Sequence, residues 1–307
     1  MNLGDLSTTQ LARMLASGTL ALRVHPFALR IHSDIASFGE RLHYFYNNYE
    51  TCEGAQIFDF HVSLTHTTGL RRWVGQQAVF RFDGHQPFQP MTASHALPLF
   101  EWGLNWTIAN NSHQFLMVHA AVIDRNGAAA ILPAPPGSGK STLCAALALR
   151  GWRLLSDELA MFNPLDATLT ASPRPISLKN ASIDVIRNFA PDACVGPVSH
   201  DTHKGSVAHM KVPPSSLKDA SRQSQPKWII FPQFREGAAS DLQPYSKART
   251  LVRLADNAFN YALFGVAGFE LLTKVVEAAD CYEFVYGDLD DAIRMFGSLP
   301  LPGHAAS

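Results

Sequence analysis

The chain has 307 residues, of which 47% are hydrophobic and 17% are charged, a composition that supports a sizeable buried core and excludes an intrinsically disordered chain. At roughly 150 residues per domain, this length predicts two domains. The 25 Lys and Arg and the 26 Asp and Glu leave a formal net charge of -1, which provides no overall positive field for nucleic acid or an anionic membrane, so we expect neither as a partner.

The positions of the cysteines and the first residues of the chain indicate the cellular compartment. The four cysteines are far apart and form no Cys-x-x-Cys pair, so the sequence predicts neither a zinc module nor a disulfide framework. The first residues lack the basic and apolar regions of a secretion signal, and no run of about 18 apolar residues predicts a transmembrane helix. We therefore expect a cytoplasmic protein with reduced thiols. Its oligomeric state stays open, a homo-oligomer included.

Residues 1–108 alternate between helix and strand patterns and are predicted to form an α+β N-terminal region. Ser7 and Gln10 form a capping pair for a helix that Gly18 ends. The other elements predicted from hydrophobic spacing are strands at 20–24, 27–32, 57–64 and 78–82 and helices at 33–46 and 97–108.

Residues 109–307 are predicted to form a second domain of the α/β class. The turn Asn126-Gly127 joins two predicted strands into a hairpin. The elements predicted here are strands at 116–124, 128–132, 153–162, 227–232 and 281–286 and helices near 141–150, 248–261, 269–279 and 288–299. Residues 191–226, rich in Pro, Ser and His, are predicted to be loop-like and mobile.

The loop of residues 134–142, APPGSGKST, is the most informative stretch. It matches the phosphate-loop pattern G-x-x-x-x-G-K-[ST] except at the first position, where Ala134 replaces glycine; the following proline favours an extended backbone there, which alanine can adopt. Glycines in the loop let backbone N–H groups approach phosphate oxygens, a lysine binds the β- and γ-phosphates, and a serine hydroxyl joins the Mg²⁺ shell. The sequence therefore predicts a nucleoside triphosphate site contacted by Pro136, Gly137, Ser138, Gly139, Lys140, Ser141 and Thr142.

An acidic pair, Asp157 and Glu158, follows an apolar strand pattern 17 residues after Lys140. One carboxylate can bind Mg²⁺, and the other can orient or deprotonate an attacking hydroxyl. Because neighbouring strand side chains point to opposite faces, an alternative is that Asp157 alone faces the phosphate loop while Glu158 meets solvent or a base. Asp157 is the stronger candidate.

Other charged residues near these motifs have both a functional and a structural interpretation. His119 lies among apolar residues, where a hydrogen-bonded core histidine is the more common case. Arg174, Lys179 and Lys204 follow the acidic pair and could stabilise a transferring phosphoryl group, although surface solvation is the alternative for each. The histidines of residues 200–209 do not have zinc-site spacing, and a mobile lid over the nucleotide is the preferred interpretation.

Three of these motifs together resemble the HPr kinase family, in particular its shorter bacterial group of HprK-related kinases (the kinase A-like group). The resemblance is carried by His119-Ala120-Ala121, by the loop of residues 136–141 and by Ser156-Asp157-Glu158. The family has a histidine followed by a small residue, a G-x-G-K-S loop and an A-D-D motif at these separations. The match covers mainly residues 115–165.

The resemblance implies an α/β P-loop kinase fold of the HPr kinase/phosphoenolpyruvate carboxykinase-like type, with a mixed β-sheet and flanking helices. It implies ATP and Mg²⁺ as cofactors and transfer of the γ-phosphate to a serine hydroxyl of a protein or peptide, linked in related pathways to a PqqD-like peptide chaperone. The roles that it implies are Mg²⁺ binding by Ser141, Asp157 and Glu158, triphosphate binding by Lys140, general base catalysis by Asp157, and tuning of a carboxylate by His119.

One departure limits the resemblance. The Glu-x-Arg-Gly-x-Gly signature of the bifunctional HPr kinase/phosphorylases is absent, and residues 172–179, SPRPISLK, stand in its place. Phosphorylase activity and HPr itself as substrate are therefore not implied. Two alternatives stay open from the sequence: a small-molecule, carboxykinase-like kinase and a non-catalytic ATP-binding regulator.

Overall fold

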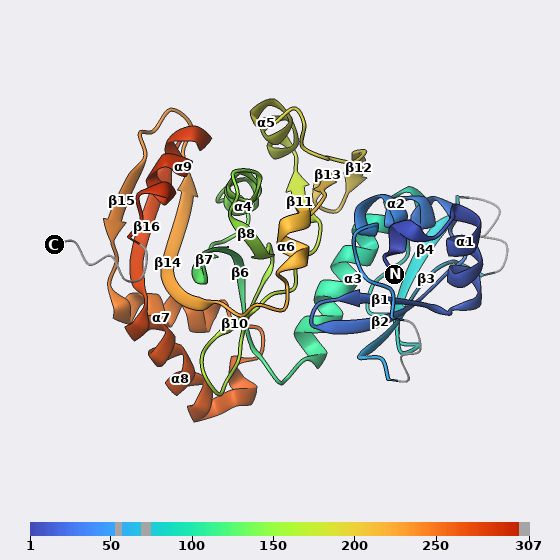
Figure 1. Ribbon diagram of the computed structural model, residues 1–307, viewed down its shortest axis with the longest axis horizontal. Helices are drawn as coiled ribbons and strands as arrows, with labels where there is room; N and C mark the ends of the chain where they lie inside the picture. The colour runs from blue at the N-terminus through green and yellow to red at the C-terminus, as the bar shows by residue number, and fades with distance from the viewer. Residues whose placement is uncertain (53–56, 69–74, 301–307) are drawn as a thin grey trace.

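The N-terminal part of the chain forms a sheet of its own, seen in blue in Figure 1. The computed structural model describes residues 1–52, 57–68 and 75–300. The elements of this part are α1 (Thr8–Ser17), β1 (Leu20–Val24), β2 (Phe27–Ser33), α2 (Ala36–Tyr46), β3 (Phe60–His66), β4 (Gln77–Phe82), β5 (Met91–Thr92) and α3 (Ala96–Asn111). The strands pair in sequence order, β2 and β3 in parallel and the other neighbours antiparallel. The predicted cap of α1 is confirmed, because Ser7 Oγ accepts from the N–H of Gln10 and the helix ends at Gly18.

The remaining residues build a larger sheet and a small one. Their strands are β6 (Leu116–Arg125), β7 (Ala128–Pro133), β8 (Arg153–Ser156), β9 (Leu159–Phe162), β10 (Leu169–Thr170), β11 (Ile176–Lys179), β12 (Ser199–Thr202), β13 (Gly205–Met210), β14 (Gln225–Phe234), β15 (Asp241–Pro244) and β16 (Asp280–Tyr286). Their helices are α4 (Lys140–Leu149), α5 (Ala181–Phe189), α6 (Pro214–Lys218), α7 (Lys247–Asp256), α8 (Tyr261–Ala278) and α9 (Leu289–Gly297).

The larger sheet is mixed. Its order is β10-β9-β6-β7-β14-β16-β15, with β8 also pairing with β6, and β11-β13-β12 form the small sheet. β7, β14 and β16 run parallel to one another, whereas β6, β9 and β15 run antiparallel to their neighbours. The prediction of a mixed α/β protein is therefore confirmed. No helix among the described residues is long and apolar enough to cross a membrane.

Alternate side chains of β6 point into two separate layers of the hydrophobic core. Met117, Ala121 and Ile123 join the hydrophobic cluster that includes α4, while Leu116, Val118 and Val122 join the cluster that includes α7 and α8. Because successive strand residues point to opposite faces, His119 belongs to the face of Met117 and Ala121. That face is the one on which α4 and the loop before it lie.

Helix α3 stands between the N-terminal sheet and the rest of the molecule (Figure 1). It continues to Asn111, so the predicted boundary between residues 108 and 109 falls in its last turn. One hydrophobic cluster includes buried residues from the N-terminal sheet, α3 and α4. The two parts of the chain therefore share a core.

Two sequence predictions are corrected. The strand predicted over 153–162 is two strands, β8 and β9, because the chain bends at Asp157 and Glu158 between them. The loop predicted over 191–226 contains β12, β13 and α6, and β13 pairs with β11. Its polar composition concealed β13, in which Val207 and Ala208 point to opposite faces and are both buried.

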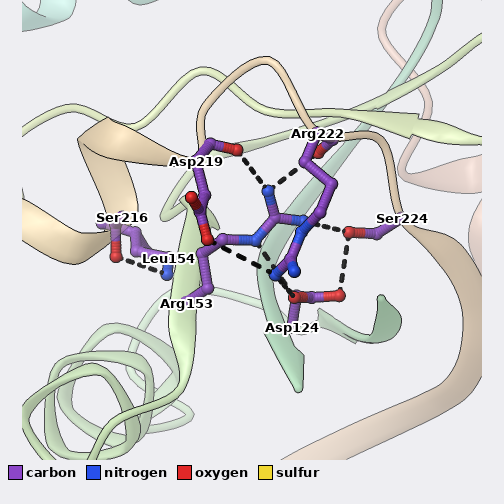
Figure 2. A network of polar contacts seen from close by, with 7 residues as sticks. All are labelled: Asp124, Arg153, Leu154, Ser216, Asp219, Arg222 and Ser224. Carbon is purple, nitrogen blue, oxygen red and sulfur yellow. Dashed lines mark hydrogen bonds and ion pairs between the residues drawn. The ribbon is translucent and has the colours of Figure 1, made fainter. Parts of the chain in front are cut away.

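A buried ion-pair network fixes the chain that returns to β14 (Figure 2). The carboxylate of Asp124 on β6 accepts from Arg153 Nε on β8 at 3.0 Å and from Ser224 Oγ at 2.9 Å. Arg153 Nη1 also donates to the carbonyls of Asp219 and Arg222. Since Asp124 and Arg153 are both buried, these contacts compensate charges that would otherwise be costly to remove from water.

Candidate functional site

The predicted phosphate loop joins β7 to α4. Pro136, Gly137, Ser138 and Gly139 lie between the two elements, and Lys140, Ser141 and Thr142 form the first turn of α4. Gly137 and Gly139 have φ values of +86° and +85°, a region in which side chains are strained. Ala134 has no positive φ, so alanine fits at the position where the motif usually has glycine. The loop thus leads into the N-terminus of α4, where the first backbone N–H groups have no carbonyl partner within the helix.

Two aromatic residues from neighbouring strands hold the loop. The hydroxyl of Tyr286, at the end of β16, donates to the carbonyl of Gly139 at 2.9 Å. The N–H of Phe234, at the end of β14, donates to the carbonyl of Ser138 at 2.9 Å. A Cβ at Gly139 would lie 2.3 Å from the Tyr286 hydroxyl, so only glycine fits there. Sequence reasoning missed both aromatics; their one signal was that parallel strands bring their carboxyl ends to the edge where the loop begins.

Lys140, His119 and Glu158 form a continuous chain of polar contacts. Lys140 Nζ lies 3.0 Å from His119 Nε2, and the same ring nitrogen lies 2.9 Å from Glu158 Oε2. This nitrogen can accept from Lys140 when it carries no hydrogen, or donate to Glu158 when it does, but not both at once. The predicted lysine, histidine and glutamate are thus brought together, and Glu158 faces a base rather than bulk solvent.

Asp157 is buried beside this chain of contacts. Burial raises the pKa of Asp157, and the negative charge of Glu158 raises it further. The charges of Lys140 and Lys179 and the nearby Ser141 side chain lower it by less, so the pKa remains at about 6. A carboxylate with such a pKa can take up a proton near neutral pH.

Glu158 is shifted in the opposite direction. Burial alone would raise the pKa of Glu158, but the hydrogen bond from His119, together with the charges of Lys140 and Lys179, outweighs burial and lowers this pKa to about 2. The two adjacent carboxyl groups therefore differ in charge state at mildly acidic pH. Such a separation is typical of acid and base roles divided between neighbouring groups.

The contacts of Asp157 leave one oxygen open. Oδ2 accepts from the N–H of Ser177 at 3.3 Å, whereas Oδ1 is buried and has no hydrogen-bond partner within the described part of the chain. Mg²⁺ prefers carboxylate and hydroxyl oxygens, completed by phosphate and water. The carboxyl groups of the acidic pair and the Ser141 hydroxyl fit that preference. Over the described ranges, no group of three or more His, Cys, Asp or Glu could hold a metal ion by itself.

A small cavity adjoins Asp157. It is lined by Asp157, Glu158, Ser177 and His209, together with residues of α3, and has room for a single water. Burial and nearby cations, Arg41 first among them, lower the pKa of His209 to about 3, so its ring is neutral. His209 belongs to β13, opposite Ser177, and is not part of a lid.

The three predicted cations have different surroundings. Lys179 ends β11, and its charge acts on both carboxyl groups. Lys204 lies 4.9 Å above the ring of Trp102, and burial followed by the charge of Lys179 lowers its pKa. Arg174 is buried and contacts Glu101 and Asn105 of α3. Lys179 and Lys204 thus contribute charge near the acidic pair, while the guanidinium of Arg174 ties this region to α3.

The chain matches no known protein-family model and no curated protein. The resemblance carried by the motifs therefore stays a prediction.

Proposed function

We propose that this protein is an ATP-dependent kinase of the P-loop type, with a fold like that of HPr kinase and phosphoenolpyruvate carboxykinase, which transfers the γ-phosphate to a serine hydroxyl of a protein or peptide. The observation that carries the proposal is the meeting of a phosphate-loop lysine with His119 and Glu158 beside the buried carboxylate of Asp157. These groups come from α4, β6 and the bend after β8. They supply a phosphate-binding cation and a candidate base at one edge of the sheet.

Each residue has a distinct task in this reaction. Bound ATP and Mg²⁺ supply the phosphoryl group and neutralise its charge. Lys140 holds the β- and γ-phosphate oxygens, and Ser141 and a carboxylate of the acidic pair would hold the metal. Asp157, through its unpartnered Oδ1, accepts the proton of the attacking hydroxyl. Glu158 stays ionised, and His119 lies between Glu158 and Lys140, in contact with both.

Exposed apolar residues, one of them beside the site, favour a protein or peptide acceptor. The ring of Phe259 lies 5.8 Å from the ring of His119, and it is 52% exposed. Leu263 and Val266 on α8 are 68% and 75% exposed, and residues 261–269, YALFGVAGF, contain no charge. We call Phe259, Leu263 and Val266 the α8 surface. Exposed apolar surface of this kind marks protein contacts.

The cavity beside Asp157 holds about one water and encloses no acceptor as it stands. The small-molecule alternative would need a larger enclosed pocket at this place. A PqqD-like chaperone that delivers the peptide remains part of the proposal.

Labelled ATP and mass spectrometry test the proposal. The purified protein is incubated with [γ-³²P]ATP, Mg²⁺ and proteins that co-purify with it, and labelled products are mapped. We expect phosphoserine on one of these partners, lost in D157N, while K140A no longer binds ATP. Label that persists in D157N would overturn the base assignment. ATP binding without transfer to any partner would point to the non-catalytic regulator instead.

A further inference from the structure

We propose that the base of the bound nucleotide stacks on Phe234, at the carboxyl end of β14. This inference rests on the proposed function, because it concerns the nucleotide whose phosphates the loop would hold. Phe234 is the last residue of β14, and 47% of it is exposed. A half-exposed aromatic side chain beside a phosphate-binding loop is in a position to contact a ligand bound there.

Sheet topology determines the side from which the nucleotide reaches the loop. β7, which precedes the loop, lies between β6 and β14. His119 is on β6, and Glu158 lies next to β9, which pairs with β6. The γ-phosphate must therefore lie toward β6. Because the triphosphate is a linear chain, the nucleoside at its other end must leave toward β14 and β16.

The ends of β14 and β16 are suited to a ligand. Both strands are parallel to β7, so all three carboxyl ends meet at one edge of the sheet, where ligands of open α/β sheets bind. At this edge, the ring of Phe234 packs against the ring of Tyr286, with centroids 5.6 Å apart. Tyr286 is itself held by its bond to Gly139. The Phe234 ring is thus supported from one side and exposed on another.

Phe234 is also in direct contact with the loop. Its N–H bonds to the carbonyl of Ser138, and its Cβ lies 2.9 Å from where a Cβ of Gly139 would be. A base on this ring therefore lies beside the loop whose residues Gly139 and Lys140 would hold the phosphates. Stacking on an aromatic ring accepts any base, because every base has a π-face. The class of ligand is a nucleoside triphosphate held by its phosphates and by stacking.

Comparison of ATP with inorganic tripolyphosphate, which has no base, separates the contribution of the base to affinity from that of the phosphates. Both ligands are titrated with Mg²⁺ into wild type, F234A, F234W and F269A by calorimetry. Alanine keeps the Cβ and the backbone bond of residue 234. F269A removes a phenylalanine of similar exposure, 51%, from α8.

F234A is expected to weaken ATP binding by about tenfold, the order of loss for removal of one stacked ring, and to leave tripolyphosphate binding unchanged. F234W should restore ATP binding, and F269A should bind both ligands as wild type does. Unchanged ATP affinity in F234A would overturn the inference, and so would an equal loss for both ligands, which would mean a distorted loop. Wild type that binds neither ligand would instead overturn the proposed function and this site with it.

Discussion

Lys140 and His119 face each other across the phosphate loop, with Nζ and Nε2 3.0 Å apart. The contact joins the first residue of α4 to the middle of β6, which is 21 residues earlier in the chain. Lys140 is buried in this arrangement, so its ammonium is aimed by His119 rather than by water. The position of the lysine head group therefore depends on a side chain that the phosphate-loop motif does not contain.

Replacement of His119 by alanine should lower the rate of transfer more than it lowers ATP affinity. The change removes the ring that contacts both Lys140 and Glu158, and loss of an orienting partner costs about 10–100-fold. We expect kcat to fall by that order while ATP affinity changes little. Single-turnover transfer and ATP titration measure the two effects. A His119→Ala protein with normal kcat would assign His119 to the core only.

Asp157→Asn should be more stable than wild type, and by a larger margin as the pH rises. In the native state the pKa of Asp157 is raised from 3.8 to about 6 by burial and by Glu158. The folded protein thus holds this proton more tightly than the unfolded chain, and the stability that the protonated group contributes is lost as pH rises through about 6. The difference in Tm between Asp157→Asn and wild type should therefore grow between pH 5 and pH 7.

Glu158→Gln provides a control of opposite sign. The native pKa of Glu158 lies below its ordinary 4.5, because the effects of His119, Lys140 and Lys179 outweigh burial. Its charged form therefore stabilises the fold above pH 4.5, and this contribution is lost as the pH falls toward 2. Thermal unfolding at pH 7 should show Glu158→Gln less stable than wild type. If both variants shift Tm in the same direction, the assigned charge states are wrong.

Gly139→Ala should damage the loop far more than Gly137→Ala. Both glycines have positive φ, which costs about 1–2 kcal/mol for alanine. A Cβ at Gly137 meets nothing within 4 Å, whereas one at Gly139 would meet the Tyr286 hydroxyl at 2.3 Å. We expect ATP affinity to fall by at least about tenfold in Gly139→Ala, ~1.4 kcal/mol. Partial recovery in Gly139→Ala/Tyr286→Phe, by calorimetry, would confirm the cause; equal effects at both glycines would contradict it.

The sequence predicted those parts of the site that lie within short motifs. The loop, the acidic pair and His119 follow from residue type and spacing, and the structure brings Lys140, His119 and Glu158 into contact. Nothing near Tyr286 in the sequence indicates that its hydroxyl supports Gly139, 147 residues away. Such contacts depend on the order of strands in the sheet, which local patterns do not encode.

The same reasoning explains the errors in the predicted elements. The run at 153–162 is apolar enough for one strand, but it is broken by a bend at Asp157, which is buried, and Glu158, which is partly buried. The charge of Lys140 acts on both carboxyl groups there. The hairpin of β12 and β13 was hidden because its outward residues are polar. Cap and turn signals, by contrast, are local, and the helix between Ser7 and Gly18 was predicted correctly.

Charges introduced on the α8 surface should weaken binding of the protein acceptor and leave nucleotide binding unchanged. Leu263→Asp and Val266→Asp place a carboxylate on exposed apolar positions, so the fold should tolerate them. Loss of an apolar contact at an interface commonly costs more than ~1 kcal/mol, so KM for the protein acceptor should rise by several-fold with ATP affinity unchanged. Val185→Asp, on exposed α5 and at the opposite end of Figure 1 from α8, is the control. Normal KM in both α8 variants would exclude this surface from acceptor binding.

Arg153→Met should destabilise the fold far more than Arg222→Ala, although both arginines contact Asp124 (Figure 2). Removal of Arg153 leaves the fully buried carboxylate of Asp124 without its main partner, which costs about 3–5 kcal/mol. The Arg222 side chain is half-exposed, so its ion pair is worth at most about 1 kcal/mol. Urea unfolding measures both changes. The double variant Arg153→Met/Asp124→Leu removes both buried charges and should recover much of the lost stability. No recovery would mean that Arg153 stabilises the fold through the carbonyls of Asp219 and Arg222 rather than through its pairing with Asp124.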